Sequence, residues 1–182
     1  MVTDAVAHKY LIGVDTNGST LFGLPGSHAY TVMGAYPIKD AAGNVVARLM
    51  HVRNPWAMDY YSGPWNDGDT TRWTAANKAQ VPYVNGNDGS FFIEVADFVR
   101  AFYYFQIGYV QDNWKRSYYE VTNDNGAQKT FTFSTTKTQD LFVQADFYDS
   151  RMYSTGCKST YAKGSLSVYK GTTLMSSTSF TD

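Results

Sequence analysis

Residues 28–56 read HAYTVMGAYPIKDAAGNVVARLMHVRNPW and predict a β-hairpin. Two runs rich in β-branched and aromatic residues, 28–38 and 45–52, flank the polar connection KDAAGN. Gly43 and Asn44 in that connection tolerate the positive φ that tight hairpin turns need. We therefore expect two antiparallel strands joined by a turn centred near residue 41.

The same hairpin brings a His and an Asn together. With the turn centred at residue 41, antiparallel pairing places His28 opposite Asn54. An Asn carbonyl oxygen can accept one imidazole N–H, which fixes the tautomer and leaves the other ring nitrogen free. In Cys-His-Asn triads a His held in this way deprotonates a thiol. Pro55 disfavours helix at Asn54, and the indole of Trp56 can shield the hydrogen bond from water.

Composition and charge bound the class of protein. The 182 residues are 43% hydrophobic, enough to form a core in one domain or two small ones. Fifteen basic and sixteen acidic residues leave a net charge of −1 without a basic run, so nucleic acid is not an expected partner. Apolar runs such as 101–105 are far too short to span a membrane. The single cysteine, Cys157, excludes an internal disulfide and predicts an intracellular, cytoplasmic location.

The remaining sequence is typical of a mainly β protein with short helices (α+β). Strands are expected near 10–14, 91–95 and 106–110, with one or two helical turns in 71–80 and an amphipathic helix over 95–105. Beyond a polar break at 111–116, short alternating runs with turn signals predict a β-sandwich-like segment, which could be incomplete. We therefore expect two domains, residues 1–112 and 113–182.

Three ordered motifs carry a resemblance to a known family. GLPGSHAYTVMGA (23–35), RLMHVRNPWAMDYYSGPWND (48–67) and DGSFFIEVADFVRAFYYFQI (88–107) resemble the second half of a calpain-type cysteine protease core. The resemblance implies the antiparallel-sheet half of a papain-like fold, followed by the start of a β domain. It also implies that His28 and Asn54 are two triad members and that Trp56 sits between the two halves of the core.

The family's nucleophilic cysteine belongs to an N-terminal half that precedes the His. No cysteine precedes His28 here, and Cys157 lies in the sandwich-like segment without a nucleophile's surroundings. The resemblance thus implies part of a calpain-like intracellular cysteine endopeptidase that acts on proteins and peptides. Alone it would be inactive, with the N-terminal half carrying the cysteine as its partner. The alternative is a non-catalytic, calpain-like, β-rich interaction module.

The resemblance also implies a calcium site. Asp67, Asp88 and the carbonyl of Gly86 match ligand positions in the family, whereas Tyr60 and Ser90 stand where acidic side chains are expected. Because Ca²⁺ takes six to eight oxygens, two carboxylates predict a weak or lost site.

Two smaller departures lie beside the triad residues. Ser27 and Ala57 both stand where the family usually has Gly, and each adds a Cβ close to the cleft.

Overall fold

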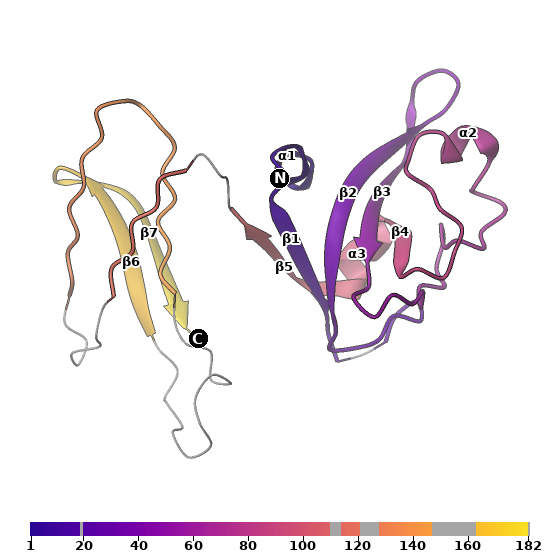
Figure 1. The fold of residues 1–182 in the computed structure, drawn as a ribbon, viewed down its shortest axis with the longest axis horizontal. Coiled ribbons are helices and arrows are strands. Elements are labelled where there is room, and N and C mark those ends of the chain that lie inside the picture. The colour runs from indigo at the N-terminus through magenta and orange to yellow at the C-terminus, as the bar shows by residue number, and fades with distance from the viewer. Residues whose placement is uncertain (19, 110–113, 121–127, 147–162, 182) are drawn as a thin grey trace, which may run out of the picture. The chain divides into compact units, whose positions relative to one another are not determined.

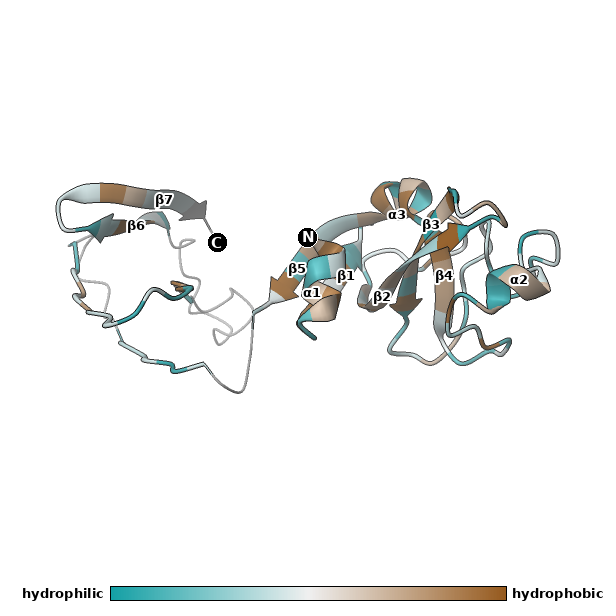
Figure 2. Ribbon diagram, turned by 90° about the horizontal axis from the view of Figure 1, so that it is seen from above, coloured by the Kyte–Doolittle hydropathy of each residue, from teal (hydrophilic) through white to brown (hydrophobic). Residues whose placement is uncertain are grey.

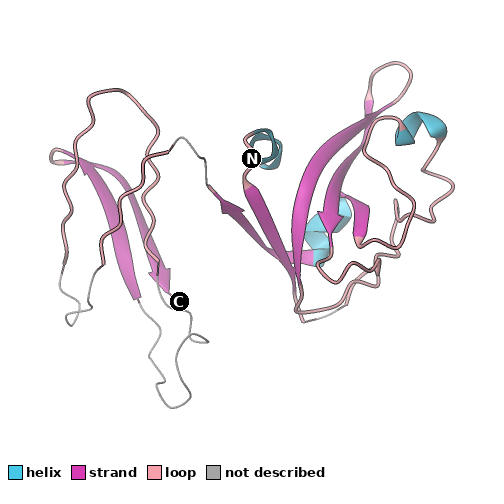
Figure 3. Cartoon of the chain, viewed as in Figure 1, coloured by secondary structure: helices cyan, strands magenta, loops and turns pink. Residues whose placement is uncertain are grey.

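The computed structural model describes residues 1–18, 20–109, 114–120, 128–146 and 163–181. The chain divides into two compact units, Met1–Arg116 and Ser117–Asp182. Residues 112 and 113, where the sequence places a domain boundary, lie outside the described residues, so that boundary stays a prediction. Strands and loops dominate both units and the helices are short (Figure 3), which confirms the mainly β, antiparallel fold class.

The first unit is built on a five-stranded antiparallel sheet in the order β4-β3-β2-β1-β5 (Figure 1). Its strands are β1 (Leu11–Thr16), β2 (Ala29–Lys39), β3 (Val45–Arg53), β4 (Ser90–Glu94) and β5 (Phe102–Gly108). Three short helices accompany them: α1 (Val2–Ala7), α2 (Ala75–Lys78) and α3 (Val95–Ala101). The β2–β3 hairpin therefore lies near the middle of the sheet.

The hairpin forms as predicted, but its predicted register is wrong. Thr31 pairs with Arg53 and Val32 with Val52, because the turn runs from Asp40 to Asn44 and is centred at residue 42. The Asp40 carboxylate caps this turn by accepting the backbone N–H of Asn44 at 2.8 Å.

Two irregularities in the hairpin cancel each other. The register shifts once at Met33 in β2 and once at Val46 in β3, so the pairing at both ends follows the same offset. Extending that offset beyond the strand puts Tyr30 level with Asn54 and His28 level with Trp56.

The predicted helix over 95–105 is too long. Helix α3 ends at Ala101, and the aromatic run that follows forms strand β5, whose β-rich composition favours extended backbone. Val95 and Val99 are exposed, whereas Phe98, Ala101 and Phe102 are buried. Helix α2 falls within the helical turns predicted at 71–80, and α1 was not predicted.

Strand β3 is covered on both faces. One cluster of buried residues includes Met50 and Val52 together with Tyr30 and Phe91. Residues of the other parity, Ala47 and Leu49, belong to a second cluster, whose remaining members are Ile38, Trp65, Trp73 and Phe92. Hydrophobic residues also gather on β4 and α3 (Figure 2). The second cluster anchors the long 54–89 segment, which therefore packs against the sheet although it is mostly irregular.

The second unit contains one hairpin among its described residues, β6 (Lys163–Lys170) with β7 (Thr173–Thr181). Strands were also predicted in 117–146, but the described parts of that range carry none. In the described ranges of the whole chain, no helix has the length and apolar character needed to cross a bilayer.

Candidate active site

His28 and Asn54 meet at the end of the β2–β3 hairpin opposite its turn. His28 Nε2 lies 2.8 Å from Asn54 Oδ1. The two residues are not directly opposite in the register, so the imidazole leans along the sheet to reach the amide. The contact that the sequence predicted is therefore present, with a different strand alignment beneath it.

The hydrogen bonds around Asn54 decide the tautomer of His28. Asn54 Nδ2 donates to Met58 O at 2.9 Å, and Asn54 Oδ1 accepts the backbone N–H of Trp56 at 3.0 Å. These partners orient the amide, so the atom facing His28 is an acceptor and Nε2 must donate. In the neutral ring, Nδ1 is then left with a lone pair. Asn54 is 1% exposed, which keeps water from competing for its oxygen.

The Asn-Pro-Trp sequence forms the turn that makes this geometry possible. Strand β3 ends at Arg53, and Asn54 N–H donates to Gly89 O at 2.7 Å. Ala57 N–H then donates to Asn54 O at 3.1 Å and closes the turn. The Asn54 side chain bonds the backbone two residues on, as Asn does in Asx turns.

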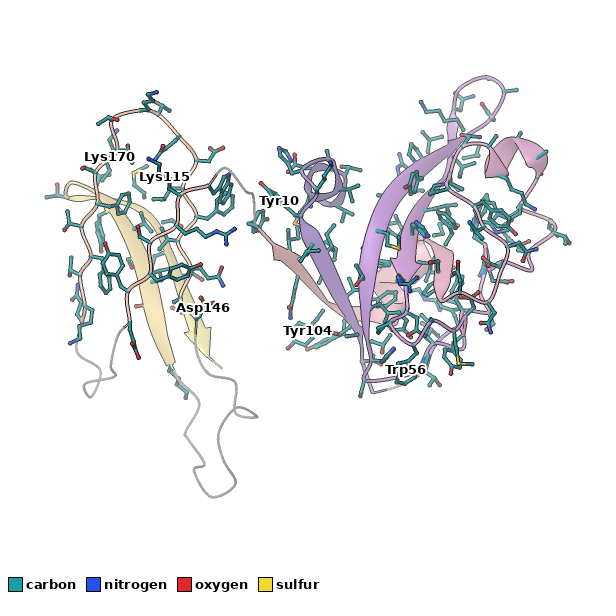
Figure 4. The ribbon with its side chains drawn as sticks, viewed as in Figure 1. Tyr10, Trp56, Tyr104, Lys115, Asp146 and Lys170 are labelled. Atoms are coloured by element: carbon teal, nitrogen blue, oxygen red, sulfur yellow. The ribbon has the colours of Figure 1, made fainter. Side chains whose placement is uncertain are left out.

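The Trp56 ring covers the imidazole. Its centroid lies 3.9 Å from that of His28 with an interplanar angle of 33°. Trp56 is nevertheless 57% exposed, at the end of the hairpin away from the turn (Figure 4). It thus packs against His28 and presents its remaining surface outward.

Thr16 holds the backbone of His28, a role that no pattern in the sequence predicts. The buried Thr16 hydroxyl accepts His28 N–H at 3.1 Å and donates to Pro25 O at 2.7 Å, while Thr16 N–H donates to His28 O at 3.0 Å. Strand β1 therefore holds the backbone of His28 in place, directly before β2 begins.

Tyr30 lies on the inner side of the imidazole, with ring centroids 4.8 Å apart. Its hydroxyl is buried and has no hydrogen-bond partner among the described residues. Burial, with a smaller effect of Tyr60, raises the pKa of Tyr30 to about 12. Tyr30 is therefore a neutral neighbour of His28.

Residues 2–109 match the model of the calpain family cysteine proteases. The chain belongs to the calpain family. It is 37% identical to mouse Calpain-12 over 87 residues, which are 47% of this chain and 12% of that protein. It is 36% identical to a Schistosoma mansoni Calpain over 84 residues, which are 44% of this chain and 11% of that protein.

A third relative is the mouse Calpain-1 catalytic subunit, 30% identical over 124 residues. That match covers 62% of this chain and 17% of the relative. The chain therefore spans less than a fifth of the length of these curated calpains.

The two positions at which the calpain pattern has Gly keep a backbone that suits Gly. Ser27 has φ 52° and Ala57 has φ 54°, both in the left-handed region. Side chains with a Cβ are strained there. Ser27 and Ala57 therefore raise the energy of the two turns beside His28 and Asn54.

The predicted calcium ligands lie in two loops of the 54–89 segment. Asp67 Oδ2 accepts Gly86 N–H at 3.2 Å, and Asp88 Oδ1 accepts Ser90 N–H at 2.7 Å. Burial raises the pKa of Asp67 to about 6, against the opposing Gly86 hydrogen bond and with the negative charges of Asp59 and Asp88 adding to the rise.

This donor set fits calcium poorly. The Tyr60 hydroxyl donates to Met58 Sδ at 3.6 Å, and within the described ranges no three His, Cys, Asp or Glu residues form a group able to hold a metal. Calcium prefers several acidic ligands.

Asp59, for which the sequence pattern carries no signal, joins the Asn54 turn to the loop that precedes β4. Its carboxylate accepts Gly89 N–H at 2.7 Å, and its own N–H donates to Asn87 Oδ1 at 2.7 Å. Its two partners lie 28 and 30 residues further along the chain, so the role of Asp59 becomes visible only in the folded structure. Cys157 lies outside the described residues.

Proposed function

We propose that this chain supplies the His and Asn of a Cys-His-Asn triad in a calpain-type endopeptidase. The observation that carries the proposal is the 2.8 Å contact between His28 Nε2 and Asn54 Oδ1, which leaves Nδ1 available to a thiol. Membership of the calpain family supports the same chemistry. The substrates are proteins and peptides, and the enzyme works inside the cell.

The nucleophile in this proposal is a cysteine from a segment outside these residues, and the isolated chain is inactive. His28 removes the thiol proton and later returns it to the leaving amine. Asn54 holds the imidazole in the tautomer that this transfer requires. Trp56 shields the hydrogen bond between them.

The test uses the protein expressed from its complete gene and a fluorogenic peptide substrate. We expect thiol-dependent cleavage, and we expect His28→Ala to lower kcat/KM by about 10⁴-fold or more. The control is His8→Ala, because His8 is exposed and its hydrogen bond goes to Asp4, four residues earlier. Cleavage that survives His28→Ala would contradict the proposal, and a complete protein that a thiol-reactive peptide probe fails to label would favour the non-catalytic interaction module.

A further inference from the structure

A pair of reciprocal hydrogen bonds ties the Asn54 turn to the loop that precedes β4. Gly89 N–H donates to Asp59 Oδ1, and Asp59 N–H donates to Asn87 Oδ1, each at 2.7 Å. We name these two bonds the Asp59 clasp. Both join segments that are about thirty residues apart in sequence, so the clasp closes a large loop.

The clasp acts on Asn54 through both its backbone and its side chain. Gly89, which donates to Asp59, also accepts Asn54 N–H at 2.7 Å. Met58, whose carbonyl accepts the Asn54 amide at 2.9 Å, directly precedes Asp59. The residues that orient the amide are therefore held by the residues of the clasp.

Close packing restricts the contact between Gly89 and the Asn54 turn. Gly89 is buried with φ 87°, and a Cβ there would lie 2.7 Å from Ala57 Cα and 2.8 Å from Asn54 O. The loop backbone thus sits directly against the Asn54 turn.

We propose that Asp59 is a positioning residue for the His28–Asn54 pair, and that the clasp does in this chain what a calcium ion would otherwise do in cross-linking these loops. The inference rests on the proposed function for its catalytic meaning. Asp59 closes the loops through two bonds within the protein: its carboxylate accepts Gly89 N–H, and its backbone N–H donates to the side-chain oxygen of Asn87. Of the acidic residues at the predicted ligand positions, Asp88 accepts the N–H of Ser90 two residues on, and Asp67 accepts the N–H of Gly86; neither of these bonds reaches the Asn54 turn.

The test follows the Nε2–H proton of His28 by NMR in the full chain, with chelator and then with about 1 mM calcium, a concentration that saturates most protein sites. We expect a protected Nε2–H signal in chelator that calcium leaves unchanged. Asp59→Ala should lose the signal, and Asp59→Asn should retain it because the amide oxygen still accepts Gly89 N–H.

The comparison variant is Asp88→Asn, which removes the charge at a predicted calcium ligand and keeps an acceptor for Ser90 N–H. It should retain the signal. The amide of Val14, in the buried part of β1, reports whether each variant is folded. If Asp59→Ala fails to fold, Asn87→Ala removes the other bond of the clasp and should weaken the Nε2–H protection.

Two results would overturn the inference: a signal that needs calcium, or a loss in Asp88→Asn as large as that in Asp59→Ala. Neither result bears on whether the complete protein cleaves peptides. An intact signal in a complete protein without proteolysis would instead refute the proposed function and leave the clasp standing.

Discussion

Ser27 and Ala57 carry a strain that their neighbours impose. The backbone turns left-handed at each position, next to His28 in one case and two residues after Pro55 in the other. A left-handed conformation costs a residue with a Cβ about 1–2 kcal/mol. The hydrogen bonds of the turn, including the bond from Ala57 N–H to Asn54 O, offset this cost.

We expect Ala57→Gly to raise the free energy of unfolding by about 0.5–1 kcal/mol, because the strain is relieved and part of the gain is lost to the entropy of the unfolded chain. The measurement is urea denaturation followed by tryptophan fluorescence. The matched control is Ala35→Gly in the extended strand β2, which should lower the free energy of unfolding by a similar amount. Destabilisation by Ala57→Gly would argue against the left-handed turn.

The proximity of His28, Asn54 and Trp56 could be predicted from the sequence because one short hairpin brings all three together. Asp59, Asn87 and Thr16 could not be predicted. They act through backbone groups of distant segments, and neither their spacing nor their residue type distinguishes them from ordinary turn and strand residues. Bonds of this kind become visible only when the loops are placed in space.

At the scale of elements, the turn chemistry of KDAAGN predicted the hairpin, while its register depended on details that composition does not show. The Asp40 cap centres the turn one residue later than expected, and that difference moves the strand pairs at both ends of the hairpin by two positions. The excess length of the predicted helix has a similar origin. Residues 102–105 satisfy a helical apolar pattern, but pairing with β1 draws them into β5.

Strand β3 makes the stability of the protein depend on pH, because both of its faces are covered and one of its buried residues is a histidine. His51 is 7% exposed and stacks on Phe92 with centroids 4.4 Å apart. Burial lowers the pKa of His51, and the nearby negative charge of Asp88 opposes the effect only in part. The pKa of His in the unfolded chain is about 6.5, so below that pH the unfolded chain binds a proton that the folded protein does not bind.

Stability from this residue is therefore lost as the pH falls through about 6.5 toward the lower folded value. The variant His51→Phe has no titrating group at this position. We expect its free energy of unfolding to rise relative to that of the wild-type chain as the pH falls from about 7.5 to about 5.5. Chemical denaturation at several pH values measures the difference, and His8 and His28 are common to both chains. Parallel curves for the two chains would exclude a buried, neutral His51.

At the scale of the whole molecule, the two units differ in how much they bury. The first unit has two hydrophobic clusters, whereas none of the described residues in the second unit is buried. A two-stranded hairpin such as β6–β7 is marginal by itself. The cooperative unfolding of the chain should therefore come from the first unit.

We expect a chain that ends at Arg116 to keep the thermal midpoint of the longer chain within about 2 °C, since none of the described residues of the second unit is buried. Near-ultraviolet circular dichroism follows the aromatic clusters of the first unit. A fall of several degrees would show that residues 117–182 stabilise it.

The open end of a single β-ribbon holds both His28 and Asn54. A rigid-body rotation of the first unit must carry both groups together, so it cannot separate the base from the amide that aims it. In a complete protease, opening and closing would change the distance that a thiol has to travel to Nδ1. Such an enzyme would then be regulated through the approach of the nucleophile, while the imidazole stays in its working orientation throughout.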